Sequence, residues 1–292
     1  MVRMRSPRIL GLSAAAGVLV LASACSPADD NDNDSASASP GEGECSVDSL
    51  PVKNEGTLTI ATDDPAFEPW FADNDPSNGE GYEGAVAYAV AEELGFAAED
   101  VEWVVVPFNS SYQPGAKDFD FDINQVSISE DREQAVDFSE PYYSAAQAII
   151  TLEDSDFAGA TSLEEFADAR LGAQIGTTSL TAIDQIDPSS EPLVYDDTVK
   201  AAQALENDQV DAIVADLPSA FYLTAVEIDG SVIAGQFQPE TGQSEEFGLL
   251  MEKDSELKPC LDAAVVELRD NGTLDDIETE WLSESADVPE LQ

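Results

Sequence analysis

Hydrophobic and polar positions along the chain alternate between strand-like and helix-like patterns. Short apolar runs, typical of buried strands, occupy residues 57–61, 101–106 and 121–124. An apolar helical pattern at 85–95 ends in a glycine, a residue that often terminates helices. Further strands are predicted at 147–151, 170–174, 211–215 and 247–251, and further helices at 162–169, from 176 onward, and at 198–207, 257–270 and 274–282. This alternation predicts an α/β fold with largely parallel sheets.

The two successive series of strands and helices predict two lobes. The structured part of the chain is longer than a typical single domain. We expect lobe 1 to comprise residues 46–146 and 249–286, and lobe 2 to comprise residues 147–248, with a tail at 287–292. The chain would then cross between the lobes twice.

The N-terminal residues have the pattern of a secretory signal. Three arginines and no acidic residue precede an apolar run at 9–21, and the small residues of the Ala22-Ser23-Ala24 stretch follow. The run is shorter than the about 20 residues that a membrane-spanning helix needs. We therefore predict a signal peptide at 1–24. Its removal has two possible routes: ordinary cleavage after Ala24, or lipoprotein processing with lipidation of Cys25.

The number of cysteines favours lipidation. An exported chain with Cys25, Cys45 and Cys260 has one thiol more than a set of disulfides can use. Lipidation of Cys25 leaves Cys45 and Cys260, which we predict to form a disulfide. Residues 25–45 are rich in Asp, Ser, Asn and Gly and predict a disordered acidic tether. We therefore expect a protein on the extracellular face of the membrane, attached to it only through a lipid.

Charge and composition exclude several functions. The chain has 61 acidic and 11 basic residues, a net charge of −50, and no histidine. Such a surface repels nucleic acid. Without histidine, Ser-His-Asp and Cys-His catalysis and imidazole zinc sites are excluded. We expect a binding protein rather than an enzyme, with no cofactor and no metal.

One segment carries a specific resemblance. Residues 127–132 read SISEDR and residues 135–143 read AVDFSEPYY. This segment resembles the extracellular amino-acid-binding proteins of bacterial ABC importers, known as solute-binding protein family 3, and the resemblance extends over residues 56–283. It implies a two-lobed periplasmic-binding-protein-like fold of type II, whose lobes close on a ligand.

Arg132 is the strongest candidate for a ligand contact. A guanidinium matches a planar carboxylate with two parallel hydrogen bonds, and Arg132 is one of two arginines between residues 9 and 200. The alternative is an ion pair with Glu130 or Asp131. The resemblance implies that Ser127 offers its hydroxyl to the same carboxylate.

The resemblance also implies contacts for the rest of an amino acid. Asp64 and Asp216 match positions that hold the ligand ammonium, and Phe67 and Phe108 match its aromatic walls. The alternatives are a turn residue for Asp64, a helix N-cap for Asp216, and core packing for the two phenylalanines.

Two further segments of the site are less regular. Thr177 and Thr178 open a predicted helix, where free backbone N–H groups can bind an anion or the hydroxyls can simply cap the helix. Gln125 departs from the family, which has Gly or Ser there, and its longer side chain could reach the ligand.

These observations predict high-affinity binding of a small zwitterionic ligand, an amino acid, and its delivery to an ABC transporter permease by lobe closure. We expect a monomer. One alternative ligand is an osmolyte of the ectoine type, which also combines a carboxylate with a cationic nitrogen. Another alternative is an enzyme similar to prephenate or arogenate dehydratases, which share the fold.

The acidic composition predicts adaptation to high salt. With a net charge of −50, repulsion among surface carboxylates destabilises the folded state, and added ions screen it. The melting temperature should rise when NaCl is increased from about 0.1 to about 2 M. A melting temperature that stays constant over this range would contradict the prediction.

Overall fold

The computed structural model describes residues 45–239, 245–282 and 288–291. The predicted signal peptide, Cys25 and most of the tether lie outside these residues. Within the described part, no helix is both long enough and apolar enough to cross a membrane.

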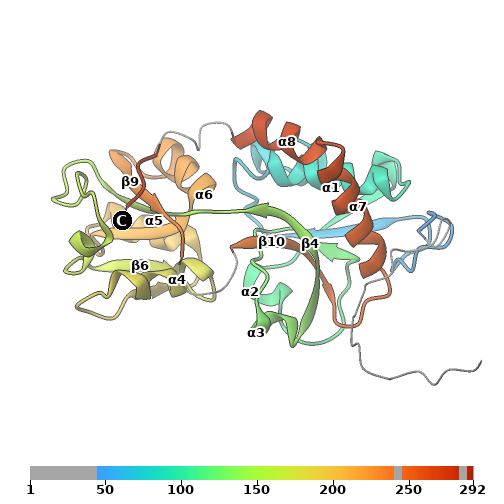
Figure 1. Cartoon of the computed structure of the whole chain (residues 1–292), viewed down its shortest axis with the longest axis horizontal. Coiled ribbons are helices and arrows are strands. Elements are labelled where there is room, and N and C mark those ends of the chain that lie inside the picture. Colours follow the sequence, from blue (N-terminus) through green and yellow to red (C-terminus); the bar gives the residue numbers. More distant parts are fainter. Residues whose placement is uncertain (1–44, 240–244, 283–287, 292) are drawn as a thin grey trace, which may run out of the picture. The chain divides into compact units, whose positions relative to one another are not determined.

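Two mixed five-stranded sheets organise the chain (Figure 1). The first has the order β2-β1-β3-β10-β4 and the second the order β7-β6-β8-β5-β9. In each sheet three strands are parallel, and the other two pair antiparallel to their neighbours. The strands are β1 (Leu58–Thr62), β2 (Val101–Val105), β3 (Phe121–Asp122), β4 (Val136–Ser144), β5 (Gln147–Leu152), β6 (Leu171–Gln174), β7 (Leu193–Tyr195), β8 (Ala212–Asp216), β9 (Ser231–Phe237) and β10 (Glu246–Glu252). The predicted two-lobed α/β fold is confirmed, but the sheets are mixed and not largely parallel as expected.

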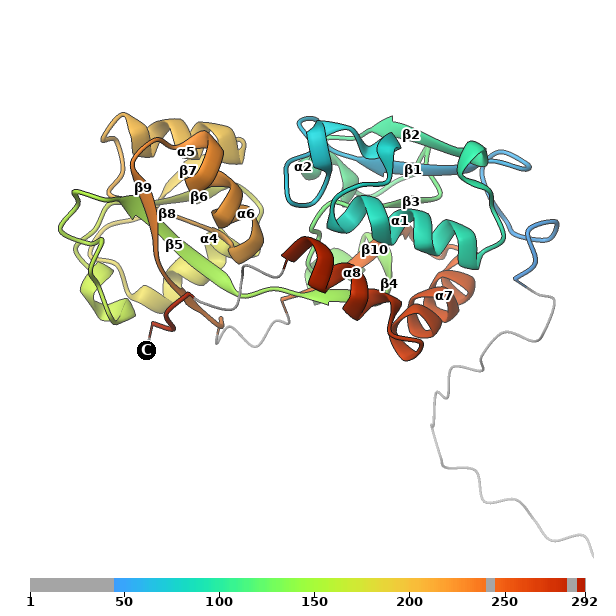
Figure 2. The same ribbon diagram turned by 90° about the horizontal axis from the view of Figure 1, so that it is seen from above.

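Helices cover the sheets, and they differ in places from the predicted ranges (Figure 2). The helix expected at 85–95 begins earlier, because the backbone of Gly81 adopts a φ of 90° and starts it at Tyr82. The helix expected at 162–169 is a single 3₁₀ turn, Leu163–Phe166. The α-helices are α1 (Tyr82–Glu93), α2 (Phe108–Ser111), α3 (Glu130–Glu133), α4 (Thr178–Ala182), α5 (Thr198–Glu206), α6 (Leu217–Tyr222), α7 (Lys258–Asp270) and α8 (Thr273–Leu282).

Two of the passages of the chain between the lobes lie next to each other. The first passage joins β4 to β5, as expected. The second passage precedes β10, which pairs with β4 from Glu246 onward. Lobe 1 therefore resumes at 246 and not at 249. The main chains of the two passages touch, since the N–H of Ala145 donates to the carbonyl oxygen of Glu245 at 3.0 Å.

The C-terminal residues return to lobe 2, so the chain passes between the lobes three times, although we expected two crossings and a tail. After α8 in lobe 1, residues 288–291 lie along β9. Pro289 accepts a hydrogen bond from the N–H of Gln236 at 2.8 Å, and Leu291 donates one to the carbonyl of Gln236 at 2.8 Å. Leu291 is buried in the core of lobe 2. A side chain at Gly235 would meet Leu291 at 2.6 Å, so this glycine makes room for it.

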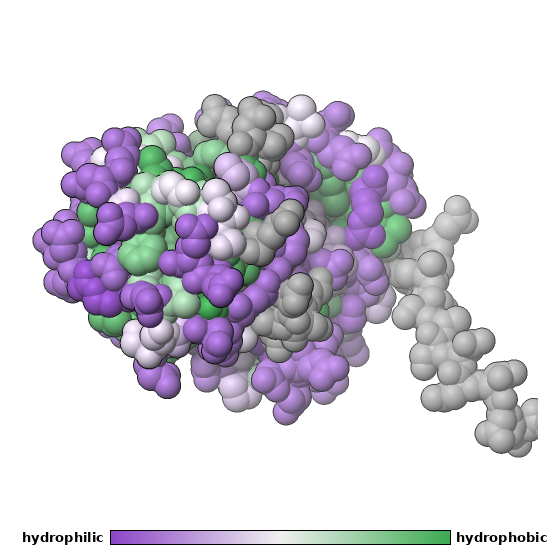
Figure 3. All heavy atoms as spheres, turned by 60° about the vertical axis from the view of Figure 1, so that its left-hand side comes forward, coloured by the Kyte–Doolittle hydropathy of each residue, from purple (hydrophilic) through white to green (hydrophobic). Residues whose placement is uncertain are grey.

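Each lobe has its own apolar core. The core of lobe 1 contains a cluster of aromatic rings that includes Trp70, Tyr82 and Phe247, all fully buried. Hydrophilic side chains cover much of the face that Figure 3 shows, with apolar areas between them.

The predicted disulfide is confirmed. Cys45 and Cys260 are bonded, with their Cα atoms 5.4 Å apart. The bond attaches the segment before β1 to α7, and it closes a loop with a sequence separation of 215.

Replacing both Cys45 and Cys260 by serine should lower the free energy of unfolding. In the chain-entropy treatment, a crosslink over so long a loop stabilises by about 5 kcal/mol, and measured effects are often smaller. We expect a loss of about 3 kcal/mol or more in denaturant unfolding. An unchanged unfolding midpoint would contradict this, and mass spectrometry of alkylated, non-reduced wild-type protein provides the control that the bond is formed.

Candidate functional site

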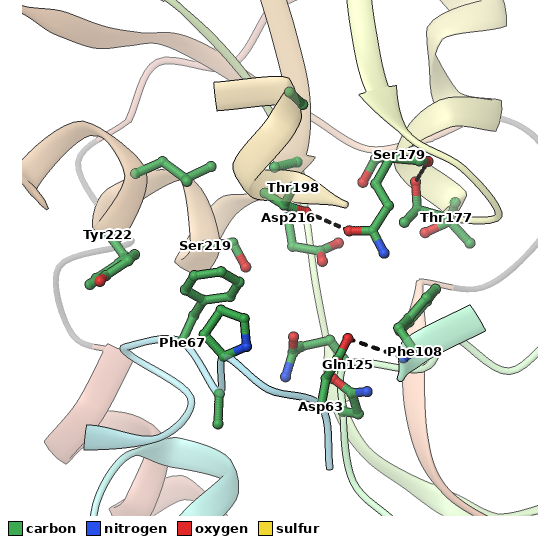
Figure 4. Close-up of a pocket in the computed structure, with 18 of the residues that line it drawn as sticks. Asp63, Phe67, Phe108, Gln125, Thr177, Ser179, Thr198, Asp216, Ser219 and Tyr222 are labelled. Atoms are coloured by element: carbon green, nitrogen blue, oxygen red, sulfur yellow. Dashed lines mark hydrogen bonds between the residues drawn. The ribbon is translucent and has the colours of Figure 1, made fainter. Parts of the chain in front are cut away.

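A pocket lies where residues of the two lobes approach each other (Figure 4). It encloses about 950 Å³ of space, part of it open to solvent. Eight of the nine side chains that the sequence nominated line it: Phe67, Phe108, Gln125, Ser127, Arg132, Thr177, Thr178 and Asp216. Asp64 is the exception.

Arg132 is held by carbonyl oxygens and aromatic rings. It lies in the short helix α3, which Ser129 caps by accepting the N–H of Arg132 at 3.3 Å. One terminal guanidinium nitrogen donates to the carbonyl of Ser127 at 2.6 Å, and the other donates to the carbonyl of Gly176 in lobe 2 at 2.8 Å. The guanidinium lies 4.8 Å from the ring centre of Tyr112.

No carboxylate of the described residues forms an ion pair with Arg132. The alternative of a structural salt bridge to Glu130 or Asp131 is therefore not observed. A guanidinium carries five N–H groups, and two of them are used by the carbonyls. The remaining N–H groups can bind an anion in the pocket.

Close approach of the lobes beside Arg132 depends on Gly176. Its φ of 76° lies in the left-handed region, which favours glycine. A Cβ here would lie 3.0 Å from Oδ1 of Asn109 and would collide with the hydroxyl of Tyr112, both in lobe 1. A larger residue would therefore displace the carbonyl that Arg132 binds.

Hydroxyl groups of both lobes meet next to Arg132. Oγ of Ser127 lies 3.2 Å from Oγ1 of Thr178. Thr178 donates to Glu245 at 2.9 Å. Thr177 caps α4 by accepting the N–H of Leu180 at 3.1 Å, and its own hydroxyl donates to the carbonyl of Gln174. For Thr177 the helix-cap alternative is thus the observed one.

Asp216 ends β8 and does not cap the helix that follows. Its side chain makes no capping hydrogen bond to α6. Instead it accepts a hydrogen bond from Nε2 of Gln147 at 2.8 Å. Burial, together with the negative charges of Glu245 and Glu83, raises the pKa of Asp216 to about 7, against the opposing effects of Gln147 and Arg132.

Of the two adjacent aspartates in the first loop, Asp63 lines the pocket. Asp64 is exposed and does not line it. Asp63 accepts the N–H of Asp64 at 2.7 Å and the N–H of Phe108 at 3.0 Å. These bonds fix its carboxylate at the pocket wall, and Figure 4 shows the bond to Phe108.

Aromatic rings of both lobes form one side of the pocket. Phe67 of lobe 1 and Tyr222 of lobe 2 have ring centres 5.8 Å apart. Nearby, the indole N–H of Trp70, which is buried in the core of lobe 1, donates to Oγ of Ser219 in lobe 2 at 2.8 Å. Sequence reasoning missed Tyr222 and Ser219, although both follow Asp216 closely in the chain and lie on the next helix.

Gln125 is bonded to the buried carboxylate of Glu83. Its φ of 48° is in the left-handed region. Its backbone N–H donates to Glu83 at 2.7 Å, and its side-chain amide also donates to Glu83, as does the hydroxyl of Tyr142. Burial raises the pKa of Glu83 to about 7, against the effect of these hydrogen bonds. The side chain of Gln125 lines the pocket, as expected of a longer residue at this position, but its amide nitrogen is engaged by Glu83.

Comparison with known proteins identifies the family. Residues 58–284 match the family model described as "Bacterial extracellular solute-binding proteins, family 3". The chain is 27% identical over 243 residues to the L-cystine-binding protein TcyJ of Escherichia coli (strain K12), an alignment that covers 81% of this chain and 86% of that protein.

Solved structures of similar proteins agree with this family assignment. An ancestral arginine-binding protein bound to glutamine superposes with a TM-score of 0.63 at 31% identity, over 78% of this chain and 99% of that one. The ancestral amino-acid-binding protein AncCDT-1, a precursor of cyclohexadienyl dehydratase, gives a TM-score of 0.61 at 27% identity, over 77% of this chain and 95% of that one. The chain belongs to the bacterial extracellular solute-binding proteins of family 3.

Proposed function

We propose that the pocket captures a small zwitterionic amino acid, which the protein delivers to an ABC transporter permease by closing its two lobes. The observation that carries the proposal is the guanidinium of Arg132, which lines the pocket and has no carboxylate partner among the described residues. Its free N–H groups suit the α-carboxylate of a ligand.

The other end of an amino acid is matched by Asp216. Its carboxylate lines the same pocket from lobe 2, and an ammonium group would neutralise a charge that is otherwise unfavourably buried. Phe67 and Tyr222 would enclose the ligand's side chain. Because the ligand contacts come from both lobes, binding would stabilise the closed arrangement.

Relatives support this class of ligand. The proteins named above are described as binding cystine, arginine or glutamine. Location at the extracellular face, attachment through a lipid on Cys25, and action as a monomer remain parts of the proposal.

A ligand panel tests the proposal. We would measure thermal shift and then calorimetric binding for the common L-amino acids, ectoine and prephenate. Binding of one or more amino acids is expected. Binding of ectoine alone would indicate an osmolyte protein, and turnover of prephenate would indicate a dehydratase.

Replacing Arg132 by alanine should weaken amino-acid binding by about 30-fold to several thousandfold, since loss of a buried charged contact typically costs about 2–5 kcal/mol. The matched control is Arg170→Ala, because Arg170 pairs with Asp211 and does not line the pocket. Wild-type affinity in Arg132→Ala would remove this residue from the site.

Replacing Asp216 by asparagine should weaken binding by about 30-fold or more, because the amide keeps the shape of the side chain and removes the charge that faces the ligand ammonium. The control is Asp64→Asn, which should leave the affinity within about twofold because Asp64 does not line the pocket. The opposite ranking of the two variants would assign the ammonium contact to the first loop.

A further inference from the structure

A chain of hydrogen bonds connects the two ends of the proposed ligand site through Glu245. It begins at Ser127 in lobe 1, passes through Thr178 in lobe 2 and reaches the carboxylate of Glu245. From Glu245 it continues through Gln147 to Asp216. Glu245 itself stands at the passage between the lobes, where its carbonyl is bonded to Ala145. Glu245, which lies where the chain passes between the lobes, is thus connected by hydrogen bonds to the groups proposed to face the ligand carboxylate and to the group proposed to face its ammonium.

The direction of these bonds follows from the available protons. While Glu245 is ionised, it only accepts, so the single hydroxyl proton of Thr178 is donated to it over 2.9 Å. Thr178 then has no proton left for Ser127, and the 3.2 Å contact between them requires Ser127 to be the donor. Both hydroxyl protons are therefore committed within the protein. A ligand carboxylate placed here would meet oxygen lone pairs.

Two carboxyl groups share one donor beside this chain. The Nε2 atom of Gln147 donates to Asp216 at 2.8 Å and to Glu245 at 2.9 Å, and Gln147 is fully buried. Arg132 from α3 is the charged group that favours the ionised form of Glu245, and Glu83 from α1 adds to the negative charge that Asp216 experiences. Burial raises the pKa of Glu245 as well. Such a pair holds one proton between its two members more readily than it ionises twice.

We propose that Glu245 is a proton-linked positioning residue, which holds the proton of the Asp216–Glu245 pair whenever a ligand carboxylate binds at Ser127 and Thr178. The proposal rests on the proposed function. In the protonated state the carboxyl of Glu245 donates to Thr178, and the hydroxyl protons of Thr178 and Ser127 become available to the ligand carboxylate. Asp216 stays ionised for the ligand ammonium. The proton comes from Asp216 when the free pair already holds one, and from solvent when both groups are ionised.

The sign of the pH dependence follows from this linkage. Above the pH at which the free pair loses its last proton, binding must take up a proton, so the affinity falls by up to tenfold per pH unit. With the pKa of Asp216 raised to about 7, we expect this decline to begin near neutral pH. An ammonium contact with Asp216 alone would have the opposite effect, because it favours proton release.

The test is calorimetric titration with L-glutamine and with L-arginine between pH 5.5 and 8.5. For the wild type we expect affinity to fall above about pH 7, together with uptake of up to one proton, measured as the difference in heat between two buffers of unlike ionisation enthalpy. Glu245→Gln should bind with an affinity constant within about twofold from pH 7 to 8.5 and without proton uptake. Glu93→Gln, which removes an exposed charge outside the pocket, should behave as the wild type.

Several results would overturn the proposal. They are proton release by the wild type at pH 8, an affinity that does not change with pH, or an alkaline decline that persists unchanged in Glu245→Gln and thus belongs to the ligand's own ammonium.

A titration without ligand separates this proposal from the proposed function. In ¹³C NMR spectra of glutamate-labelled protein, the carboxyl resonance of Glu245 is the one that is missing from the spectrum of Glu245→Gln. In the wild type this resonance should titrate above the ordinary glutamate range. The midpoint of its titration should shift when Asp216 is replaced by asparagine. A resonance that titrates in the ordinary range would refute the role of Glu245. Failure of every amino acid to bind, with this titration as expected, would count against the ligand class alone.

Discussion

The rest of the site depends on the contact between Arg132 and two backbone carbonyl groups on opposite lobes. The guanidinium binds the carbonyl of Ser127, on its own lobe, and that of Gly176, across the pocket. Carbonyl oxygens orient a cation without neutralising it, so Arg132 keeps its positive charge while its position is fixed. In a chain with 61 acidic and 11 basic residues, this arrangement preserves a cation for use inside the pocket.

Near this cation the protein buries several carboxyl groups that form no ion pair with a cation of the described residues. Glu83 and Asp216 both have a pKa raised to about 7, and that of Glu245 is raised as well, in each case mainly by burial. Glu83 binds Gln125 beneath the pocket, whereas Asp216 and Glu245 are joined by Gln147. The electrostatic balance of the site therefore favours partners that bring positive charge, or protons that take its place. In the function that we propose, an amino acid would bring an ammonium group to Asp216 and a carboxylate to Arg132.

The sequence was most informative where function and local pattern coincide. Strands such as β1 and β8 are short apolar runs, and the segment from Ser127 to Arg132 combines a distinctive motif with a rare cation, so both could be predicted. The pocket-lining aspartate of the first loop could not be assigned, because Asp63 and Asp64 are adjacent and only the backbone geometry decides which of the two lines the pocket.

Residues whose roles arise from distant contacts gave no local signal. Glu83 and Glu245 look like any other glutamates in a chain that has many, and they differ only because folding buries them against Gln125 and Gln147. Leu291 likewise stands between two polar residues, Glu290 and Gln292, and gives no sign of a core position. Its burial depends on the space left by Gly235, more than fifty positions earlier in the chain.

The order in which the lobes are assembled from the chain has a consequence for synthesis. Lobe 1 contains β10 between β3 and β4, and α7 carries the partner of Cys45, so lobe 1 is incomplete until residues beyond 260 are available. Lobe 2 buries Leu291, so it is completed later still. A chain that emerges from its N-terminus can therefore complete the packing of neither lobe until nearly all of it has been made.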